Sequence, residues 1–403
     1  MASSALFFFL GGIVVLILLM IGIVIFWKIL KPLGMMKFVL QARPAASPDF
    51  ISGNLRTISY FELKTLKKAT KNFHPDNLLG RGGFGPVYKG KLKDGRMVAV
   101  KRLSRDKSQQ GESEFLAEVR MITSIQHKNL VRLLGCCSDG AQRLLVYEFM
   151  NNGSLDHIIY GKSEMFLKWE KRFQIILGIA RGLQYLHEDS HLRIVHRDIK
   201  ASNILLDDKF QPRIGDFGLA RFFPEDEAYL STTFAGTLGY TAPEYAIRGE
   251  LSEKADIYSF GVLVLEIISC RKNTDLTLPS EMQYLPEYAW KLYERSSVLD
   301  LVDPRVREYG LVEIEKDVMR AINVAFFCLQ PHANLRPPMS EIVTMLTCPV
   351  EMVGTPIKPP FLDPRRKKII ESLSCSWDTM TEPFPSPLLD TPDHSTQSPK
   401  LPH

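Results

Sequence analysis

The sequence predicts an α+β protein with two lobes, a small β-rich lobe followed by a larger helical lobe, preceded by one transmembrane helix. Three observations predict this layout. They are an uncharged apolar stretch over residues 5–27, short β-rich runs over 78–147 separated by Gly and Asp turns, and long amphipathic stretches beyond residue 151. The net charge of +5 is small and evenly spread, which argues against nucleic-acid binding.

The first element is the apolar stretch 5–27, which contains no charge and no proline. At about 1.5 Å per residue it reaches roughly 34 Å as a helix, enough for a hydrocarbon core of about 30 Å. Lysines follow at once, so the positive-inside rule keeps the rest of the chain cytosolic and residues 1–4 outside. A cleaved signal peptide is the alternative, but no basic segment precedes the stretch and its apolar core is too long. We therefore expect a single-pass protein, in the plasma membrane, that contacts the lipid bilayer through residues 5–27.

The remaining chain divides by composition. Residues 28–57 are rich in Lys, Arg, Pro and Ser and are typical of a tether, whereas Tyr60–Phe73 show a helical pattern. The expected divisions are a juxtamembrane segment over 28–77, a catalytic domain over 78–347 with lobes 78–150 and 151–347, and a mostly disordered Pro/Ser/Thr-rich tail over 348–403.

Within the two lobes the pattern predicts individual strands and helices. Alternating β-branched and aromatic residues mark the strands, and apolar residues at helical spacing mark the helices. Strands are expected at Val87–Lys89, Val98–Val100 and Leu144–Tyr147, and helices at Ser113–Ile125, Trp169–Glu188 and Leu251–Ser269.

A glycine-rich segment runs from Gly80 to Val87 with the spacing G-x-G-x-x-G. Glycines let the backbone approach a polyphosphate closely and direct N–H groups toward it. A plain turn and a dinucleotide-binding loop are alternatives, but the latter requires a helix directly after the loop. Here a strand continues, which favours a lid over ATP.

Lys101 ends the apolar strand Val98–Val100. A lysine in this position is often only a surface group whose stem lies along apolar residues. Downstream of a phosphate-binding loop, it is instead the cation that orients the α- and β-phosphates. Glu118, in the next predicted helix, is its expected partner, with Glu112 and Glu114 as nearby competitors.

The strongest signal is the run HRDIKASN over residues 196–203, followed by Asp216-Phe217-Gly218. Phosphoryl transfer needs a carboxylate for the attacking hydroxyl, a cation on the transferred group and oxygen ligands for Mg²⁺. Asp198 supplies the carboxylate and Lys200 the cation. Asn203 and Asp216 supply oxygens that suit a hard cation such as Mg²⁺, with Mn²⁺ as the alternative ion.

With these blocks in place, residues 78–347 resemble a eukaryotic protein kinase. The sequence motifs resemble those of plant receptor-like serine/threonine kinases, relatives of the interleukin-1-receptor-associated (Pelle-like) kinases. The similarity rests on ATKNF, GRGGFGPVYKGKL, HKNLVRLLG, LLVYEFMNNGSLD, HRDIKASNILLD, GTLGYTAPEYA and DIYSFGVLVLEII. It implies the bilobal protein kinase fold, here with almost no ectodomain.

The resemblance also implies roles for further residues. Tyr147 would be the gatekeeper of the adenine pocket, Glu244 would pair with Arg336, and Asp256 would hold the catalytic loop. The residues expected to contact ATP are Leu79, Gly80, Arg81, Gly82, Gly83, Phe84, Gly85, Val87, Ala99, Lys101, Tyr147, Glu148, Met150 and Leu205.

Specificity and control follow from the same resemblance. Lys200 after Asp198, and Thr237 in the run Gly236–Tyr240, are typical of kinases that act on serine and threonine. Arg197 before Asp198 is typical of kinases in which a phosphate on the activation segment neutralises this arginine. Candidate phosphorylation sites are Ser231, Thr232, Thr233 and Thr237, the alternative being a polar loop that only happens to contain hydroxyl groups.

Two other functional classes stay open from sequence alone. A pseudokinase scaffold would act by binding alone. Such proteins commonly lose the phosphate-binding lysine, the catalytic aspartate or the metal-binding aspartate, whereas this chain retains Lys101, Asp198, Asn203 and Asp216. A membrane adaptor would act through the Pro-rich tail. Expected partners are ATP, protein substrates, and either an ectodomain-bearing receptor kinase or a second copy of this chain for trans-phosphorylation.

Overall fold

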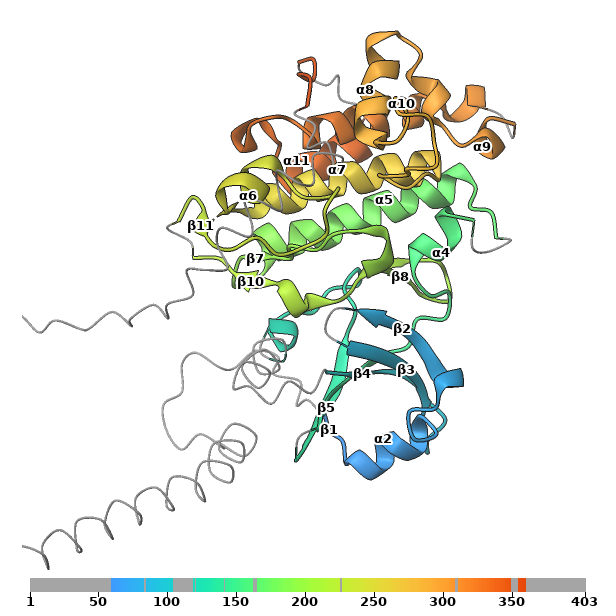
Figure 1. Ribbon diagram of the computed structural model, residues 1–403, viewed down its shortest axis with the longest axis vertical. Helices are drawn as coiled ribbons and strands as arrows, with labels where there is room; N and C mark the ends of the chain where they lie inside the picture. The colour runs from blue at the N-terminus through green and yellow to red at the C-terminus, as the bar shows by residue number, and fades with distance from the viewer. Residues whose placement is uncertain are drawn as a thin grey trace, which may run out of the picture. The chain divides into compact units, whose positions relative to one another are not determined.

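The computed structural model describes residues 59–82, 85–103, 119, 121–140, 142–161, 165–224, 227–308, 311–348 and 354–359. These residues form the predicted β-rich lobe and helical lobe, which Figure 1 shows with the sheet at one end and the helices at the other. The predicted segments 1–4, 5–27 and 28–57 lie outside the described residues, as does most of 348–403. Among the helices that are described, none has the length and apolar character needed to cross a membrane.

The smaller lobe is built on a six-stranded sheet in the order β1-β5-β6-β4-β3-β2. Its neighbouring strands are antiparallel, except that β1 runs parallel to β5. All three predicted strands occur in it. The strands are β1 (Ser59–Tyr60), β2 (Leu78–Gly82), β3 (Gly85–Lys91), β4 (Met97–Arg102), β5 (Leu133–Asp139) and β6 (Gln142–Glu148).

One face of this sheet is covered by helix α2 (Leu63–Ala69). The sequence pattern predicted helix over Tyr60–Phe73, which is too long at both ends. Tyr60 belongs to β1, and Lys71, Asn72 and Phe73 have φ angles of 51°, 57° and 56°, in the left-handed region that ends a right-handed helix. Of the predicted helix over 113–125, only residue 119 and residues 121–125 are described.

The core of the helical lobe is α7 (Glu253–Ser269), in which every residue from Ala255 to Ser269 is buried. A helix that is buried all round packs against neighbours on every side. The prediction began this helix at Leu251, but Leu251 lies in a short strand. The hydroxyl of Ser252 accepts a hydrogen bond from Lys254 N, which caps the helix at its start.

Beside α7 lies α5 (Trp169–Gln184), which gives way to a π-helical turn over Tyr185–Asp189, so the predicted helix to Glu188 changes geometry near its end. The turn leads into the loop that carries Asp198. Within the described residues the other helices are α4 (Leu155–Ile159), α6 (Pro243–Arg248), α8 (Leu285–Glu294), α9 (Pro304–Glu308), α10 (Leu311–Cys328) and α11 (Met339–Thr347).

Short strand pairs and 3₁₀ turns complete the part of the chain that the structure describes. The strand pairs are β7 (Ile194–Val195) with β10 (Arg221–Phe222), β8 (Ile204–Leu206) with β9 (Pro212–Ile214), and β11 (Leu230–Ser231) with β12 (Glu250–Leu251). The 3₁₀ turns are η1 (Pro75–Asn77), η3 (Ala201–Asn203), η4 (Phe217–Leu219), η5 (Val298–Leu301) and η6 (Ala333–Leu335).

Candidate active site

Strand β4 carries Lys101 to the boundary between the lobes. Its side chain is 7% exposed, and its Nζ lies 2.8 Å from Asp216 Oδ1 of the helical lobe. The predicted partner Glu118 lies outside the described residues. The structure therefore joins Lys101 to Asp216, one of the two residues predicted to hold Mg²⁺.

The glycine-rich segment forms the β2–β3 hairpin above this pair. Gly82 pairs with Gly85 at the end of the ladder, and Gly85 has a φ angle of 126°, which a residue with a side chain adopts only with strain. A Cβ built on Gly82 would lie 3.7 Å from Asp216 Oδ2, so the hairpin approaches the carboxylate closely. Gly83 and Phe84, between the two strands in sequence, lie outside the described residues.

Asp198 lies at the centre of a hydrogen-bonded group. Thr237 Oγ1 donates to Asp198 Oδ1 over 2.7 Å, and Lys200 Nζ lies 2.8 Å from Asp198 Oδ2 and 2.8 Å from Thr237 Oγ1. Asn203 Nδ2 donates to both the carbonyl and Oδ2 of Asp198, over 2.8 Å and 2.9 Å. The carboxylate thus has a fixed orientation, with a lysine cation beside it.

The backbone of this loop is held by Asp256 of α7. Asp256 is fully buried and accepts from His196 N (2.7 Å), from Arg197 N (2.8 Å) and, at 3.0 Å, from His187 Nε2. Burial opposes ionisation, but His187 and His196 outweigh it and lower the pKa of Asp256 below its ordinary value. The predicted role of Asp256 in holding the loop is confirmed, whereas the contribution of His187 was not foreseen.

Asp216 sits in a strained backbone conformation. Its φ of 63° and ψ of 72° lie in the left-handed region, as does the φ of 72° at Arg197. Its neighbour Gly215 donates N–H to Asn203 O over 2.9 Å, and its carbonyl contacts His196 Nε2 at 3.1 Å. These two bonds fix the residue that precedes Asp216 and so help to hold the strained conformation. Burial opposes ionisation of Asp216, but Lys101 outweighs it and lowers the pKa of this carboxyl.

The donor set formed by Asn203 and Asp216 suits a hard divalent cation. Lys101 contacts Oδ1 of Asp216 and leaves Oδ2 facing the glycine hairpin. Asn203 uses its amide nitrogen toward Asp198, so its amide oxygen is the atom available for a metal. Both are oxygen ligands of the kind that Mg²⁺ takes together with substrate phosphates.

The residues predicted to contact adenine lie on the strands that flank this site. Ala99 pairs with Tyr147 across β4 and β6, and Val87 pairs with Lys101 across β3 and β4. Glu148 directs its carboxylate away, toward Arg132 N at 2.7 Å and Arg213 Nη1 at 3.1 Å. Of the other residues expected to contact ATP, Leu79, Gly80 and Arg81 lie on β2, Met150 lies two residues after the end of β6, and Leu205 lies on β8.

The activation segment is attached to the helical lobe at several points. β11 pairs with β12, Thr232 N donates to Gly249 O over 3.1 Å, and Arg197 Nη2 donates to Thr233 O over 3.1 Å. Ser231 and Thr233 are exposed, whereas Thr237 is bonded to Asp198. This geometry disfavours Thr237 as a phosphorylation site, because a phosphate there would face the carboxylate of Asp198.

Sequence reasoning missed Tyr245. Its hydroxyl accepts hydrogen bonds from Arg197, including one from Nε at 2.9 Å, and from Ala235 N at 3.0 Å. It therefore ties the arginine next to Asp198 to the activation segment. The sequence signal for Tyr245 is its position directly after the Ala242-Pro243-Glu244 motif.

Comparison with known proteins gives a consistent answer. Residues 73–346 match the family described as protein tyrosine and serine/threonine kinase. A probable LRR receptor-like serine/threonine-protein kinase of Arabidopsis thaliana is 48% identical over 82% of this chain and 32% of its own length. Cysteine-rich receptor-like protein kinase 2 of the same plant is 47% identical over 76% of the chain and 48% of its own length.

A further relative is similar to this chain over most of its own length. Cold-responsive protein kinase 1 of Arabidopsis thaliana is 47% identical over 76% of the chain and 78% of its own length. The chain spans only about a third of the length of the LRR receptor-like relative.

Proposed function

The chain belongs to the plant receptor-like serine/threonine kinases, within the protein tyrosine and serine/threonine kinase family, and from this premise we propose its reaction and its setting. It transfers the γ-phosphate of ATP to serine and threonine hydroxyls of proteins while anchored in a membrane. The observation that carries the proposal is the convergence of Asp198, Lys200 and Thr237 at 2.7–2.8 Å, together with the Lys101–Asp216 pair at 2.8 Å.

In the proposed reaction, the substrate hydroxyl approaches Asp198, whose carboxylate orients it and accepts its proton. The oxygen forms a bond to the γ-phosphorus as the bond to the β–γ bridging oxygen breaks, and ADP leaves with that electron pair. Lys200 lies beside Asp198, where it stabilises charge on the transferred group. Lys101 orients the α- and β-phosphates.

Asn203 and Asp216 would hold Mg²⁺, which supplies positive charge to the phosphate oxygens when it is bound. The low pKa of Asp216 keeps this carboxyl ionised and ready for a cation at neutral pH. Its strained backbone, fixed through Gly215, sets where that charge lies. The protein therefore contributes orientation and electrostatics, which phosphoryl transfer chiefly requires.

Two further parts of the proposal concern setting and control. Residues 5–27 would anchor the chain in the plasma membrane with the kinase in the cytosol, and carbonate-resistant membrane association would test this.

Phosphorylation of Ser231, Thr232 or Thr233 by a second copy or by a receptor kinase would add charge beside Arg197, which already contacts Thr233 O. Mass spectrometry of the active chain would find phosphate in this run.

The test of the reaction uses the purified full-length chain with radiolabelled ATP, Mg²⁺ and a generic basic protein. We expect label on serine and threonine, and we expect Asp198→Asn to lower the rate by about 10²–10⁴-fold because the hydroxyl loses its base. Asp208→Asn, an exposed aspartate of the same lobe, is the matched control and should keep the rate. Wild-type labelling no higher than that of Asp198→Asn would favour the pseudokinase scaffold instead.

A further inference from the structure

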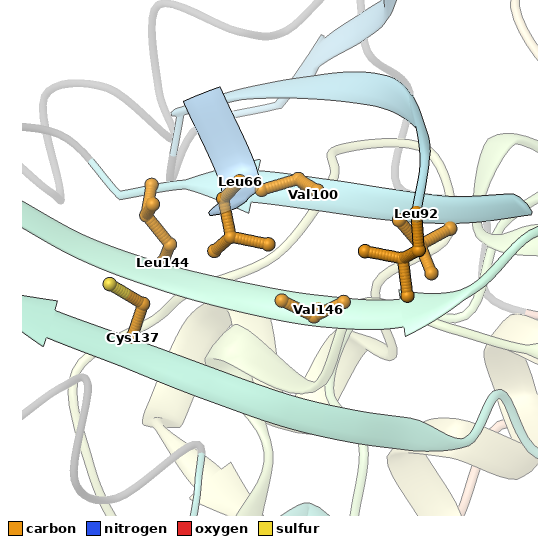
Figure 2. Packing of buried hydrophobic residues seen from close by; sticks show 7 residues of the cluster. Leu66, Leu92, Val100, Cys137, Leu144 and Val146 are labelled. Carbon is orange, nitrogen blue, oxygen red and sulfur yellow. The ribbon is translucent and has the colours of Figure 1, made fainter. Parts of the chain in front are cut away.

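Strand β4 has two faces with different neighbours. Successive side chains of a strand point to opposite faces, so Ala99 and Lys101 share one face and Val98 and Val100 the other. Val98 and Val100 are fully buried in a cluster with Leu66 of α2, as Figure 2 shows for Leu66 and Val100. Helix α2 therefore supports, from behind, the strand that presents Lys101 to the active site.

The chain that precedes the glycine hairpin is bonded to the sheet along its first residues. β1 pairs in parallel with β5, Phe61 N donates to Cys136 O over 2.9 Å, and Tyr60 Oη donates to Ser138 O over 2.5 Å. These bonds give the start of the segment a defined register on the outer strand. A backbone register is harder to shift than a side-chain contact, because every bond along it must break together.

At Gly135 of β5 the sheet leaves space for residues 59–61, which precede α2. A Cβ built there would lie 2.1 Å from Ser59 O and 2.5 Å from the ring of Phe61, closer than real Cβ atoms come to such neighbours. The φ angle of Gly135 is not positive, so the backbone conformation of the strand does not require glycine here. The close approach of residues 59–61 is what excludes a side chain at this position.

The C-terminal end of the segment 59–73 contacts Arg102, the residue that follows Lys101. Phe73 packs edge-to-face against Tyr88 of β3 with ring centroids 5.4 Å apart, and the guanidinium of Arg102 lies 5.3 Å from the Phe73 ring centroid. Thr70 closes α2 through its hydroxyl, which donates to Leu66 O over 2.8 Å and accepts from Phe73 N over 3.1 Å. Val100 and Arg102, the residues on either side of Lys101, thus both contact the segment 59–73.

We propose that residues 59–73, which we term the bracing segment, position Lys101 for ATP, with Leu66 as the central positioning residue. Packed interiors do not deform continuously, so loosening the segment lets β4 shift and moves Lys101 relative to Asp216, 2.8 Å away. A shift of about 1 Å in a phosphate-binding cation is costly to catalysis. The kinetic consequence rests on the proposed kinase function, whereas the effect on β4 itself does not.

The test compares three variants of the full-length chain. Leu66→Ala removes the buried contact, Gly135→Ala displaces the docked strand, and Lys67→Ala changes an exposed residue of α2 as the matched control. We expect the first two to raise both KM and calorimetric Kd for Mg-ATP by at least about threefold, within the ~10²-fold that such a misplacement can cost. KM for the protein substrate should stay the same, and Lys67→Ala should stay within about twofold of wild type.

Hydrogen exchange gives a readout that requires no activity. Amide protons of β4 should exchange about tenfold faster in Leu66→Ala and Gly135→Ala than in the control, because local opening becomes easier. If Leu66→Ala does not fold, Gly135→Ala carries the test, and Leu66→Met should restore wild-type values. A lower Vmax with unchanged KM for ATP and unchanged β4 exchange would reduce the segment to a stabilising role and overturn the proposal. A wild-type chain that transfers no phosphate would contradict the proposed function, and the β4 exchange would still decide the inference.

Discussion

Glu266, near the end of α7, is a fully buried carboxyl group that accepts three hydrogen bonds. The donors are Tyr160 Oη (2.7 Å), Tyr240 Oη (2.6 Å) and Asn273 N (2.7 Å). Burial is the largest influence and raises the pKa of Glu266 to about 7, although these hydrogen bonds act in the opposite direction. Because Tyr240 follows Thr237 in the activation segment, Glu266 ties this segment to the helical core.

This pKa predicts a pH-dependent contribution to stability. In the unfolded chain the pKa of a glutamate is near 4.5, so between pH 4.5 and 7 the unfolded state loses its proton while the folded state keeps it. Stability from Glu266 is therefore complete below about pH 4.5 and is lost as pH rises to about 7. The free energy of unfolding of wild type, minus that of Glu266→Gln, should fall by roughly 1–3 kcal/mol over this range.

Urea unfolding of both chains at pH 5, 6, 7 and 8 measures this difference. Other titrating groups are common to the two chains and cancel in the subtraction. A difference that does not change with pH would contradict the raised pKa.

Helix α7 ends at Cys270, which adopts the left-handed conformation with φ of 53° and ψ of 28°. Glycine is the usual residue at such a helix end, because a side chain there costs roughly 1–2 kcal/mol. Glycine also adds about 0.5–1 kcal/mol of backbone entropy cost on folding. Cys270→Gly should therefore raise the free energy of unfolding by about 0.5–1 kcal/mol.

Cys270→Ala is the matched control for this element, because it removes the thiol and keeps the Cβ that causes the strain. Thermal unfolding of the two variants separates the effects. Equal stability of the Gly and Ala variants would show that the left-handed helix end is not the source of the gain.

Across the whole molecule, Arg336 and Glu244 join segments far apart in sequence. Arg336 Nη1 and Nη2 donate to the two carboxylate oxygens of Glu244 over 2.6 Å and 2.8 Å, and Arg336 Nη1 also donates to Lys254 O over 2.9 Å. The predicted pairing is confirmed. It fixes α6, at the end of the activation segment, to the start of α7 and to the chain leading into α11.

Breaking this pair should destabilise the whole fold. Arg336→Met leaves the carboxylate of Glu244 buried without its partner, which costs about 3–5 kcal/mol, whereas adding Glu244→Gln to it should recover part of the loss. The control is Arg307→Met, which breaks the exposed Arg307–Asp300 pair and should cost less than about 1 kcal/mol. Urea unfolding would contradict this prediction if both arginine variants lost equal stability.

The sequence alone predicted the two lobes and the three strands correctly, and it pointed to the groups that we propose for phosphoryl transfer. It could do so because these features are local: strand alternation, helical spacing, and short blocks such as HRDIKASN each lie within a few residues. The Lys101–Asp216 pair was not predicted, because 115 positions separate the two residues and the expected partner of Lys101 was Glu118.

Apart from the Glu244–Arg336 pairing and the role of Asp256, which the resemblance implied, only the tertiary structure decided which distant groups meet. No local pattern indicates that Glu266 binds two tyrosines, that Tyr245 holds Arg197, or that Gly135 clears space for residues 59–61. It also shortened the helix predicted over Tyr60–Phe73, because a backbone that must turn onto a sheet leaves the helical conformation whatever its spacing suggests. These contacts depend on how elements pack against each other, and packing is a property of the folded chain rather than of any short stretch of it.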